Sequence, residues 1–306
     1  MRCLVALLSL CFVGCGTAQT GAVRIDPALA KLAPARTILL AGVKVDDLRA
    51  TEWYKRSVGE QPLPGLESFA SETGLDQRKD LSELLIASDG VNTAVLARGK
   101  FSPPAIEARL QRQGGRRMPC PGCSMVGNEQ AAVAFLDSST AVAGRPTAIR
   151  LILDQRGRSN GLPALLRSQL DAIPAQNQVW IAAAGGFGEL AKAVPQTGNL
   201  SNLGRVFSML ESGSAGLDLH TGLRLFITAV CHSEQDARSL GDAVRGMVGL
   251  ARLSAPADAP ELLKICDAVQ VQQQQRTLRV DVALSQELLD KALSRWQSAP
   301  GRPSRP

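Results

Sequence analysis

The sequence predicts an α+β fold of two tandem similar units, in which antiparallel hairpins carry helices packed on one face. The first observation is a repeated order of patterns. Strand, helices, hairpin, helix, hairpin and helix follow one another in residues 36–172 and again in residues 178–297. The second observation is the turn chemistry. Asp89-Gly90 and Thr221-Gly222 each separate two apolar runs, and glycine tolerates the positive φ that tight hairpin turns need.

The first unit, residues 36–172, opens with the strand-like run TILLAGVKV. Ser102 is a good helix N-cap, and Pro103 then stands near the first helical position, where no amide donor is needed. The remaining expected elements are helical segments at 49–57 and 66–73, a hairpin over 84–99, a second hairpin over 131–144, and helices at 146–156 and 162–172.

The second unit, residues 178–297, opens with the strand QVWIAAA. Ser233 and Asp236 have the spacing of a capping box and predict a long helix over 234–251. Alternation in TLRVDVAL puts Arg279 and Asp281 on the opposite side of their strand from the apolar residues. The other expected elements are helices at 187–193 and 200–211, a hairpin over 216–230, a hairpin pairing 267–273 with 277–284, and a final helix ending near Trp296.

The N-terminus has the pattern of a bacterial export signal. A basic residue and a short apolar run fill residues 1–14, too short for a permanent membrane helix. Phe12-Val13-Gly14-Cys15 is similar to a lipobox, which makes Cys15 the expected lipid attachment site, although Leu is usual where Phe12 stands. The small residues at 16–18 would instead suit ordinary signal peptidase.

The mature chain is therefore expected at the periplasmic face of a membrane, or free in the periplasm if it carries no lipid. Residues 15–35 are expected to be a tether, and the Pro- and Arg-rich residues 298–306 a disordered tail. Hydrophobic residues make up 45% of the chain and charged residues 20%, which is an ordinary globular balance. The net charge of +6 is scattered and aromatic residues are few, which argues against nucleic-acid binding.

Four cysteines remain after the signal and Cys15: Cys120, Cys123, Cys231 and Cys266. They allow three disulfide pairings, which the sequence leaves open. Cys120 and Cys123 form a C-x-x-C pair, which predicts either a local disulfide or a redox dithiol. A redox dithiol needs its first cysteine at the N-terminus of a helix, and the following SMVGNEQ is a poor helix. A zinc site with Cys231 and His232 would have only one typical cysteine pair.

Two glycine motifs are typical of enzymes but lack the expected surroundings. The G-x-G-x-x-A pattern at residues 186–191 follows a strand, but Pro195 and Gly198 end the following helix too early for a dinucleotide site. The G-x-S-x-G pattern at residues 157–161 follows the polar LDQR rather than the hydrophobic strand that a nucleophile elbow needs. We therefore expect no catalytic residue, no cofactor and no metal.

Three phrases carry a resemblance to known sequences: LESFASETGLDQRKDLSELLIASDG, AVAFLDSSTAVAGRPTAIRLILD and PAQNQVWIAAAGG. They resemble a family of uncharacterised exported proteins of soil bacteria, classed as a domain of unknown function. The resemblance implies a fold and a location but no activity. The expected function is thus a lipid-anchored envelope protein that binds or scaffolds an unknown protein or envelope ligand. The alternative is an envelope thiol-redox enzyme that uses Cys120 and Cys123.

Overall fold

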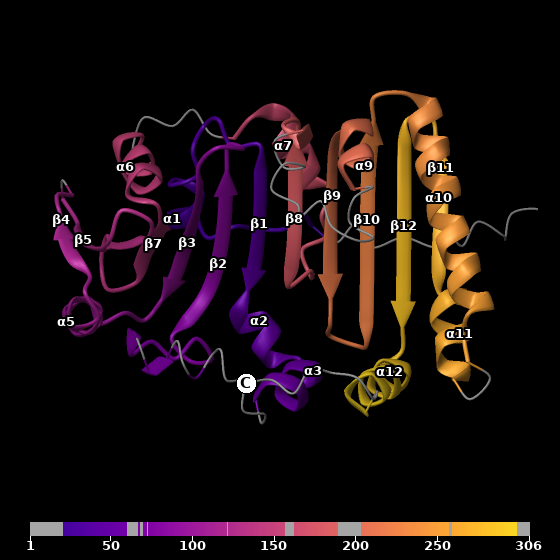
Figure 1. The fold of residues 1–306 in the computed structure, drawn as a ribbon, viewed down its shortest axis with the longest axis horizontal. Coiled ribbons are helices and arrows are strands. Elements are labelled where there is room, and N and C mark those ends of the chain that lie inside the picture. Colours follow the sequence, from indigo (N-terminus) through magenta and orange to yellow (C-terminus); the bar gives the residue numbers. More distant parts are fainter. Residues whose placement is uncertain are drawn as a thin grey trace, which may run out of the picture.

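A computed structural model describes residues 21–59, 67, 70, 71, 73–120, 122–156, 162–188, 203–256 and 259–298. Their strands form one antiparallel sheet in the order β11-β12-β10-β9-β8-β1-β2-β3-β7-β6-β5-β4 (Figure 1). Helices pack against this sheet, so the predicted α+β class with antiparallel hairpins is confirmed.

The first unit contains α1 (Pro27–Ala30), β1 (Leu39–Lys44), α2 (Val45–Ala50), α3 (Glu52–Tyr54), a π-helical turn (Lys55–Gly59), β2 (Leu81–Ser88), β3 (Thr93–Gly99), α5 (Pro103–Arg112), β4 (Arg116–Met118), β5 (Ser124–Gly127), β6 (Ala132–Phe135), β7 (Thr140–Gly144), α6 (Pro146–Asp154) and α7 (Ala164–Asp171). The second contains β8 (Val179–Ala184), α9 (Leu203–Met209), β9 (Leu210–Asp218), β10 (Leu223–Cys231), α10 (Glu234–Leu253), α11 (Pro260–Asp267), β11 (Val269–Gln274), β12 (Thr277–Leu284) and α12 (Gln286–Ser298).

The two halves of the sheet have the same strand order. Outward from the centre, the first half runs β1-β2-β3-β7-β6 and the second runs β8-β9-β10-β12-β11. Strands β1 and β8 pair with each other in antiparallel fashion, with Ala41 opposite Ile181, and this pairing joins the units. The first half carries one addition, the hairpin β4–β5, which extends its outer edge.

One face of the sheet carries the main core, and we call it the Trp180 face. Leu40, Leu85 and Trp180 are buried there beneath α1, α6 and α7. Gly42 lies directly opposite Trp180, and a Cβ on Gly42 would overlap the indole ring. Glycine is therefore needed at this point of β1, because no larger residue leaves room for the ring.

The other face, the Ile181 face, carries an apolar row of side chains from β5 to β11. Residues paired in register form a row across all the strands of the sheet, from Arg117 through Val126, Val133, Ala143, Val95, Ile86, Ala41, Ile181, Ala215, Ile227 and Val280 to Val271. Helix α5 covers the first-unit end of this face through Ile106, and α10 crosses the second-unit end, where Gly241 approaches Leu278. Helices therefore pack on both faces of the sheet: α5 and α10 on the Ile181 face, and α1, α6 and α7 on the Trp180 face. The sequence predicts helices on one face only.

The predicted hairpins and caps are largely in place. Asp89 Oδ1 accepts hydrogen bonds from the amides of Val91 and Asn92, and Gly90 has a φ of 91°. Ser233 Oγ accepts from the Asp236 amide at 3.0 Å, which begins α10 as the capping box predicts. Local side-chain chemistry fixes these turns and caps, so they can be read from the sequence.

Other elements differ from the prediction. The helix expected over 200–211 ends at Met209, because Leu210 already begins β9 and alternation of burial starts there. The hairpin β4–β5 and the helix α11 were not predicted. Of the expected tether 15–35, residues 21–35 pack against the fold: Leu29 is fully buried and the Val23 amide donates to the Ile173 carbonyl. The expected signal 1–14, the tail beyond residue 298, half of the helix at 66–73 and most of the helix at 187–193 lie outside the described residues.

Candidate functional site

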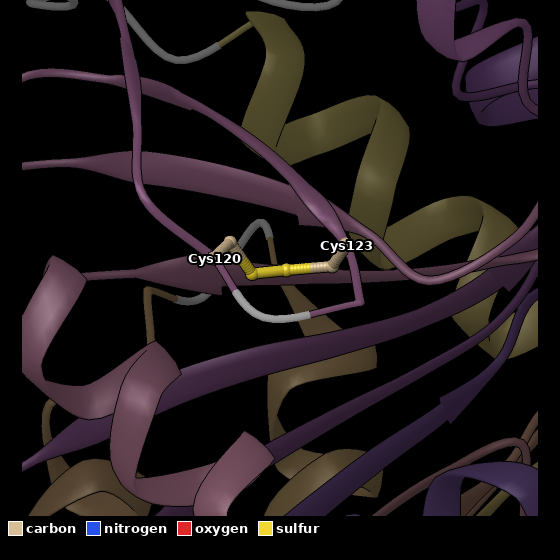
Figure 2. Close-up of a disulfide and its surroundings, with 2 residues drawn as sticks. All are labelled: Cys120 and Cys123. Carbon is tan, nitrogen blue, oxygen red and sulfur yellow. A yellow bond between two sulfur atoms is a disulfide. The ribbon is translucent and has the colours of Figure 1, made fainter.

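A disulfide joins Cys120 to Cys123 across the turn between β4 and β5 (Figure 2). The Cys123 amide donates to the Cys120 carbonyl at 3.3 Å, and Gly122 has a φ of 70°, so the backbone makes a tight turn. Both cysteines are half-buried against the edge of the main core. The pairing of these two cysteines is one of the alternatives that the sequence left open.

The surroundings of this disulfide offer little to stabilise a thiolate. Ser124 begins strand β5 directly after Cys123, so no helix N-terminus points at the sulfur atoms. Arg117, three residues before Cys120 in the chain, is held by Glu107 of α5 through a 3.0 Å ion pair. Arg117 lies in the row of the Ile181 face, whereas the disulfide packs against the core of the Trp180 face. The guanidinium is therefore directed away from the thiols.

The other two cysteines lie far from this pair. Cys231 ends β10 and is fully buried, and burial, with a smaller contribution from Asp236, raises the pKa of its thiol. Strands β5 and β10 are eight strand spacings apart in the sheet, roughly 38 Å. A zinc site of Cys120, Cys123, Cys231 and His232 is therefore excluded. The described part of the chain contains no cluster of three metal-binding side chains, and its Cys231 and Cys266 are free.

The glycine motif after β8 makes a tight turn. Gly185 and Gly186 both have positive φ values, 74° and 66°, and a Cβ on Gly186 would overlap the Ile38 side chain. The glycines thus serve close packing of the turn against the start of β1. Residues 189–191 of this motif, and all of the G-x-S-x-G pattern at 157–161, lie outside the described residues.

A hollow of about 240 Å³ opens on the Trp180 face of the second unit, and we call it the Arg224 hollow. Its walls come from the link between α7 and β8 and from strands β9, β10, β11 and β12. The residues that line it are Pro174, Gln176, Asn177, Asp218, Arg224, Leu225, Phe226, Ala268, Gln270, Arg279, Asp281, Val282 and Ala283.

A hydrogen-bonded network holds one wall of the hollow. The side chain of Gln178 is fully buried; its Oε1 accepts from the Leu219 amide at 2.7 Å and its Nε2 donates to Asp218 Oδ1 at 3.4 Å. His220 lies next to them, with its amide 3.0 Å and its Nδ1 2.7 Å from Asp218 Oδ1. Burial alone would raise the pKa of Asp218, but these hydrogen bonds outweigh burial and the pKa is lowered. Asp218 is therefore an anion at neutral pH.

The two arginines of the hollow differ in how they are held. Arg279 binds Asp281 through two hydrogen bonds of 2.7 Å, and its guanidinium lies 5.5 Å from the centre of the Phe226 ring. Arg224 is exposed and has no hydrogen bond or ion pair within the described residues. Asp218 is its direct neighbour across the β9–β10 pair, but the Asp218 carboxylate is bonded to His220 and Gln178 instead.

The sequence did not single out this group. It predicts only that Arg279 and Asp281 lie on the polar side of a strand, and it assigns no role to His220. Alternation in β12 was the available signal for Arg279 and Asp281. Gln178 and Asp218 meet across 40 residues, and no local pattern reports such a contact.

No family model and no curated protein sequence matches this chain. Three solved structures of the protein TP0453 are similar in fold. Crystal form I has a TM-score of 0.48 at 9% identity, form III 0.49 at 11%, and form IV 0.49 at 10%. In each case the similarity covers 89% of this chain and 97% or 98% of the other. No helix among the described residues is long and apolar enough to cross a bilayer. At these identities the likeness concerns the fold alone.

Proposed function

We propose that this chain is an exported envelope protein, anchored by a lipid at Cys15, that binds a partner protein through the Ile181 face without catalysing a reaction. The export signal at 1–14 and the lipobox-like residues before Cys15 support the location.

The observation that carries the binding role is the exposed apolar centre of the Ile181 face. Ile86, Ile181 and Ile227 are 38%, 39% and 41% exposed, and they lie in one row with Ala41 and Ala215 between them. Single exposed apolar residues are normal, but a continuous exposed apolar surface is typical of an interaction site. Helix α10 adds further exposed apolar side chains toward its C-terminal end: Met247, Leu250 and Leu253.

The chemistry of this surface favours an apolar protein surface as its occupant. Strands β1, β8, β9 and β10 are each paired on both sides, so their backbone groups are already bonded. The row itself offers no polar side chain between Val126 and Val271. A partner must therefore bring its own apolar side chains, and burial of that area would drive association.

Site-specific photo-crosslinking in cells tests the binding role. A photoreactive residue in place of Ile227 should give a cross-linked protein of the envelope fraction. The same residue in place of Val91, an 80% exposed apolar residue in the β2–β3 turn, is the control and should give none. Equal products at both positions, or none at Ile227, would contradict the proposal.

Acyl labelling tests the anchor separately. Cys15→Ser should abolish incorporation of a labelled fatty acid and release the protein from the membrane fraction. A wild-type protein that takes up no label would instead favour cleavage after the small residues at 16–18 and a form free in the periplasm.

A further inference from the structure

The two outer strands of the sheet differ in how well they resist pairing with another chain. The sheet ends at β4 on one side and at β11 on the other (Figure 1). Strand β4 has three residues, of which Arg116 and Arg117 are charged, and a short, charged edge strand discourages such pairing. Strand β11 has six residues, VQVQQQ, and its register with β12 is unbroken. It contains no charge, proline or bulge, so the strand itself carries none of the features that block a further strand.

The register of the β11–β12 hairpin shows which backbone groups of β11 face outward. Gln274 pairs with Thr277 across a two-residue turn, so these two residues exchange both hydrogen bonds. Alternation then directs the N–H and C=O groups of every second residue of β11 toward β12. The residues between them direct their groups away from the sheet, where they have no backbone partner among the described residues. These residues are Val269, Val271 and Gln273.

The side chains of β11 favour a second copy of the same strand as the occupant of this edge. Antiparallel pairing about a two-fold axis at Val271 places Gln270 of each copy opposite Gln272 of the other. Both side chains are exposed on the same face, beside Asp281 and Arg279 of β12. A carboxamide both donates and accepts, so the opposed glutamines can bond to each other, whereas self-pairing of β4 would bring its arginines together.

We propose that β11 pairs in antiparallel fashion with β11 of a second copy of this chain, about a two-fold axis at Val271. Such an axis is perpendicular to the sheet, so both copies keep the Ile181 face on the same side. The partner-binding surface of the proposed function then continues over both copies. Helix α10 packs on β11 beside this junction. Its exposed apolar side chains add area that strand pairing alone does not supply, and they belong to Met247, Leu250 and Leu253.

Disulfide trapping of the exported full chain tests the register of this pairing. One tagged chain carries Gln270→Cys and a differently tagged chain carries Gln272→Cys. Both carry Cys266→Ser, because Cys266 is free and partly exposed. Directly opposite residues have Cα atoms about 4.5 to 5.5 Å apart, within the range that a disulfide spans. Mild oxidation should therefore give mainly the mixed dimer, with little of either homodimer. Val91→Cys, in the exposed β2–β3 turn, is the control and should give no disulfide-linked dimer.

Sedimentation velocity of the full chain in detergent measures the strength of the pairing. Gln270→Lys with Gln272→Lys should raise the dissociation constant of the dimer roughly tenfold, because lysine then lies opposite lysine in two pairs. A mixture of this variant with Gln270→Glu and Gln272→Glu in one chain should restore the dimer, since opposite charges then meet. Gln111→Lys with Gln130→Lys is the matched control, because it adds the same charge at exposed positions of the first unit. It should leave the dissociation constant unchanged.

Three results would overturn this inference. They are a wild-type chain that sediments only as a monomer, a mixed disulfide no more abundant than the homodimers, and equal weakening by the two lysine variants. Cross-linking of Gln270→Cys or Gln272→Cys to another protein instead would make β11 a docking edge for a foreign strand. These measurements are independent of photo-crosslinking at Ile227 and of acyl labelling at Cys15, so failure of the dimer is distinguishable from failure of the proposed function.

Discussion

At the scale of the single residue, Glu107 and Asp218, the buried charged residues among those described, each have a hydrogen-bond partner. Glu83 in β2 is half-buried on the Trp180 face, opposite Lys44 and Arg98. Its Oε1 accepts a hydrogen bond from the Asp26 amide at 3.2 Å. Burial nevertheless raises the pKa of Glu83, and the nearby Asp26 carboxylate adds to the increase. This residue therefore works against stability once it is ionised.

We expect Glu83→Gln to become more stabilising, relative to the wild type, as the pH rises. With a raised pKa, the folded wild type binds more protons than the unfolded chain between the two pKa values. Its free energy of unfolding therefore falls as pH rises through that window and stays lower above it. Glutamine keeps the acceptor for the Asp26 amide and removes the titration. Urea unfolding between pH 3 and pH 7 measures the difference.

Glu52→Gln is the control with the opposite sign. A hydrogen bond from Lys55 lowers the pKa of Glu52, and both side chains are exposed. Loss of the Glu52 carboxylate should lower the free energy of unfolding slightly toward neutral pH, and added salt should screen this effect. If the difference in free energy of unfolding between Glu83→Gln and the wild type does not change with pH, Glu83 has the same pKa in the folded and unfolded states.

At the scale of the element, the hairpin β4–β5 is an addition at the outer edge of the sheet that carries the Cys120–Cys123 disulfide. Its pairing with β6 is extensive, since Ser124 to Gly127 all have partners on that strand. A disulfide that closes a loop of fifteen residues typically stabilises a fold by about 3 kcal/mol, and the stabilisation falls with loop length. The Cys120–Cys123 bond closes a much shorter loop, so it stabilises the fold less.

Replacing both cysteines with serine should therefore leave folding nearly unchanged, with a loss below about 2 kcal/mol in urea unfolding. The reduced wild type should also reduce insulin no faster than free dithiothreitol, because no helix N-terminus lowers a thiol pKa. A rate clearly above that background, absent from the double variant, would favour the thiol-redox alternative over a binding role.

At the scale of the whole molecule, the two units share one sheet and several contacts. Strands β1 and β8 pair from Leu39 to Val43, and α7 of the first unit packs on β8 and β9 of the second. Arg56 binds Asp290 of α12 through a 3.0 Å ion pair, which links the units at the end of the sheet where α2, α3 and α12 gather (Figure 1).

We expect the chain to unfold in one cooperative transition, because each unit covers core surface of the other. Trp53→Phe with Trp296→Phe leaves Trp180 as the only fluorescent indole, at the seam between the units. Its fluorescence and the far-ultraviolet circular dichroism should follow the same urea curve. Two separated transitions would mean that the units fold independently.

The sequence by itself determined the elements whose causes are local. Asp89-Gly90 predicts its hairpin, Ser233 with Asp236 predicts the start of α10, and alternation predicts the two sides of β12. These features depend on residues a few positions apart, so they are legible without the fold. The same local patterns also indicated the α+β class and the repeated order of elements.

Only the tertiary structure decided which elements meet. The pairing of β1 with β8, the row across the Ile181 face and the packing of residues 21–35 all join distant segments. Gln178 meets the Asp218 carboxylate, 40 residues away in the chain, across the paired strands β8 and β9. Such contacts arise from long-range pairing and from the geometry of the whole sheet, which periodicity and capping signals do not encode.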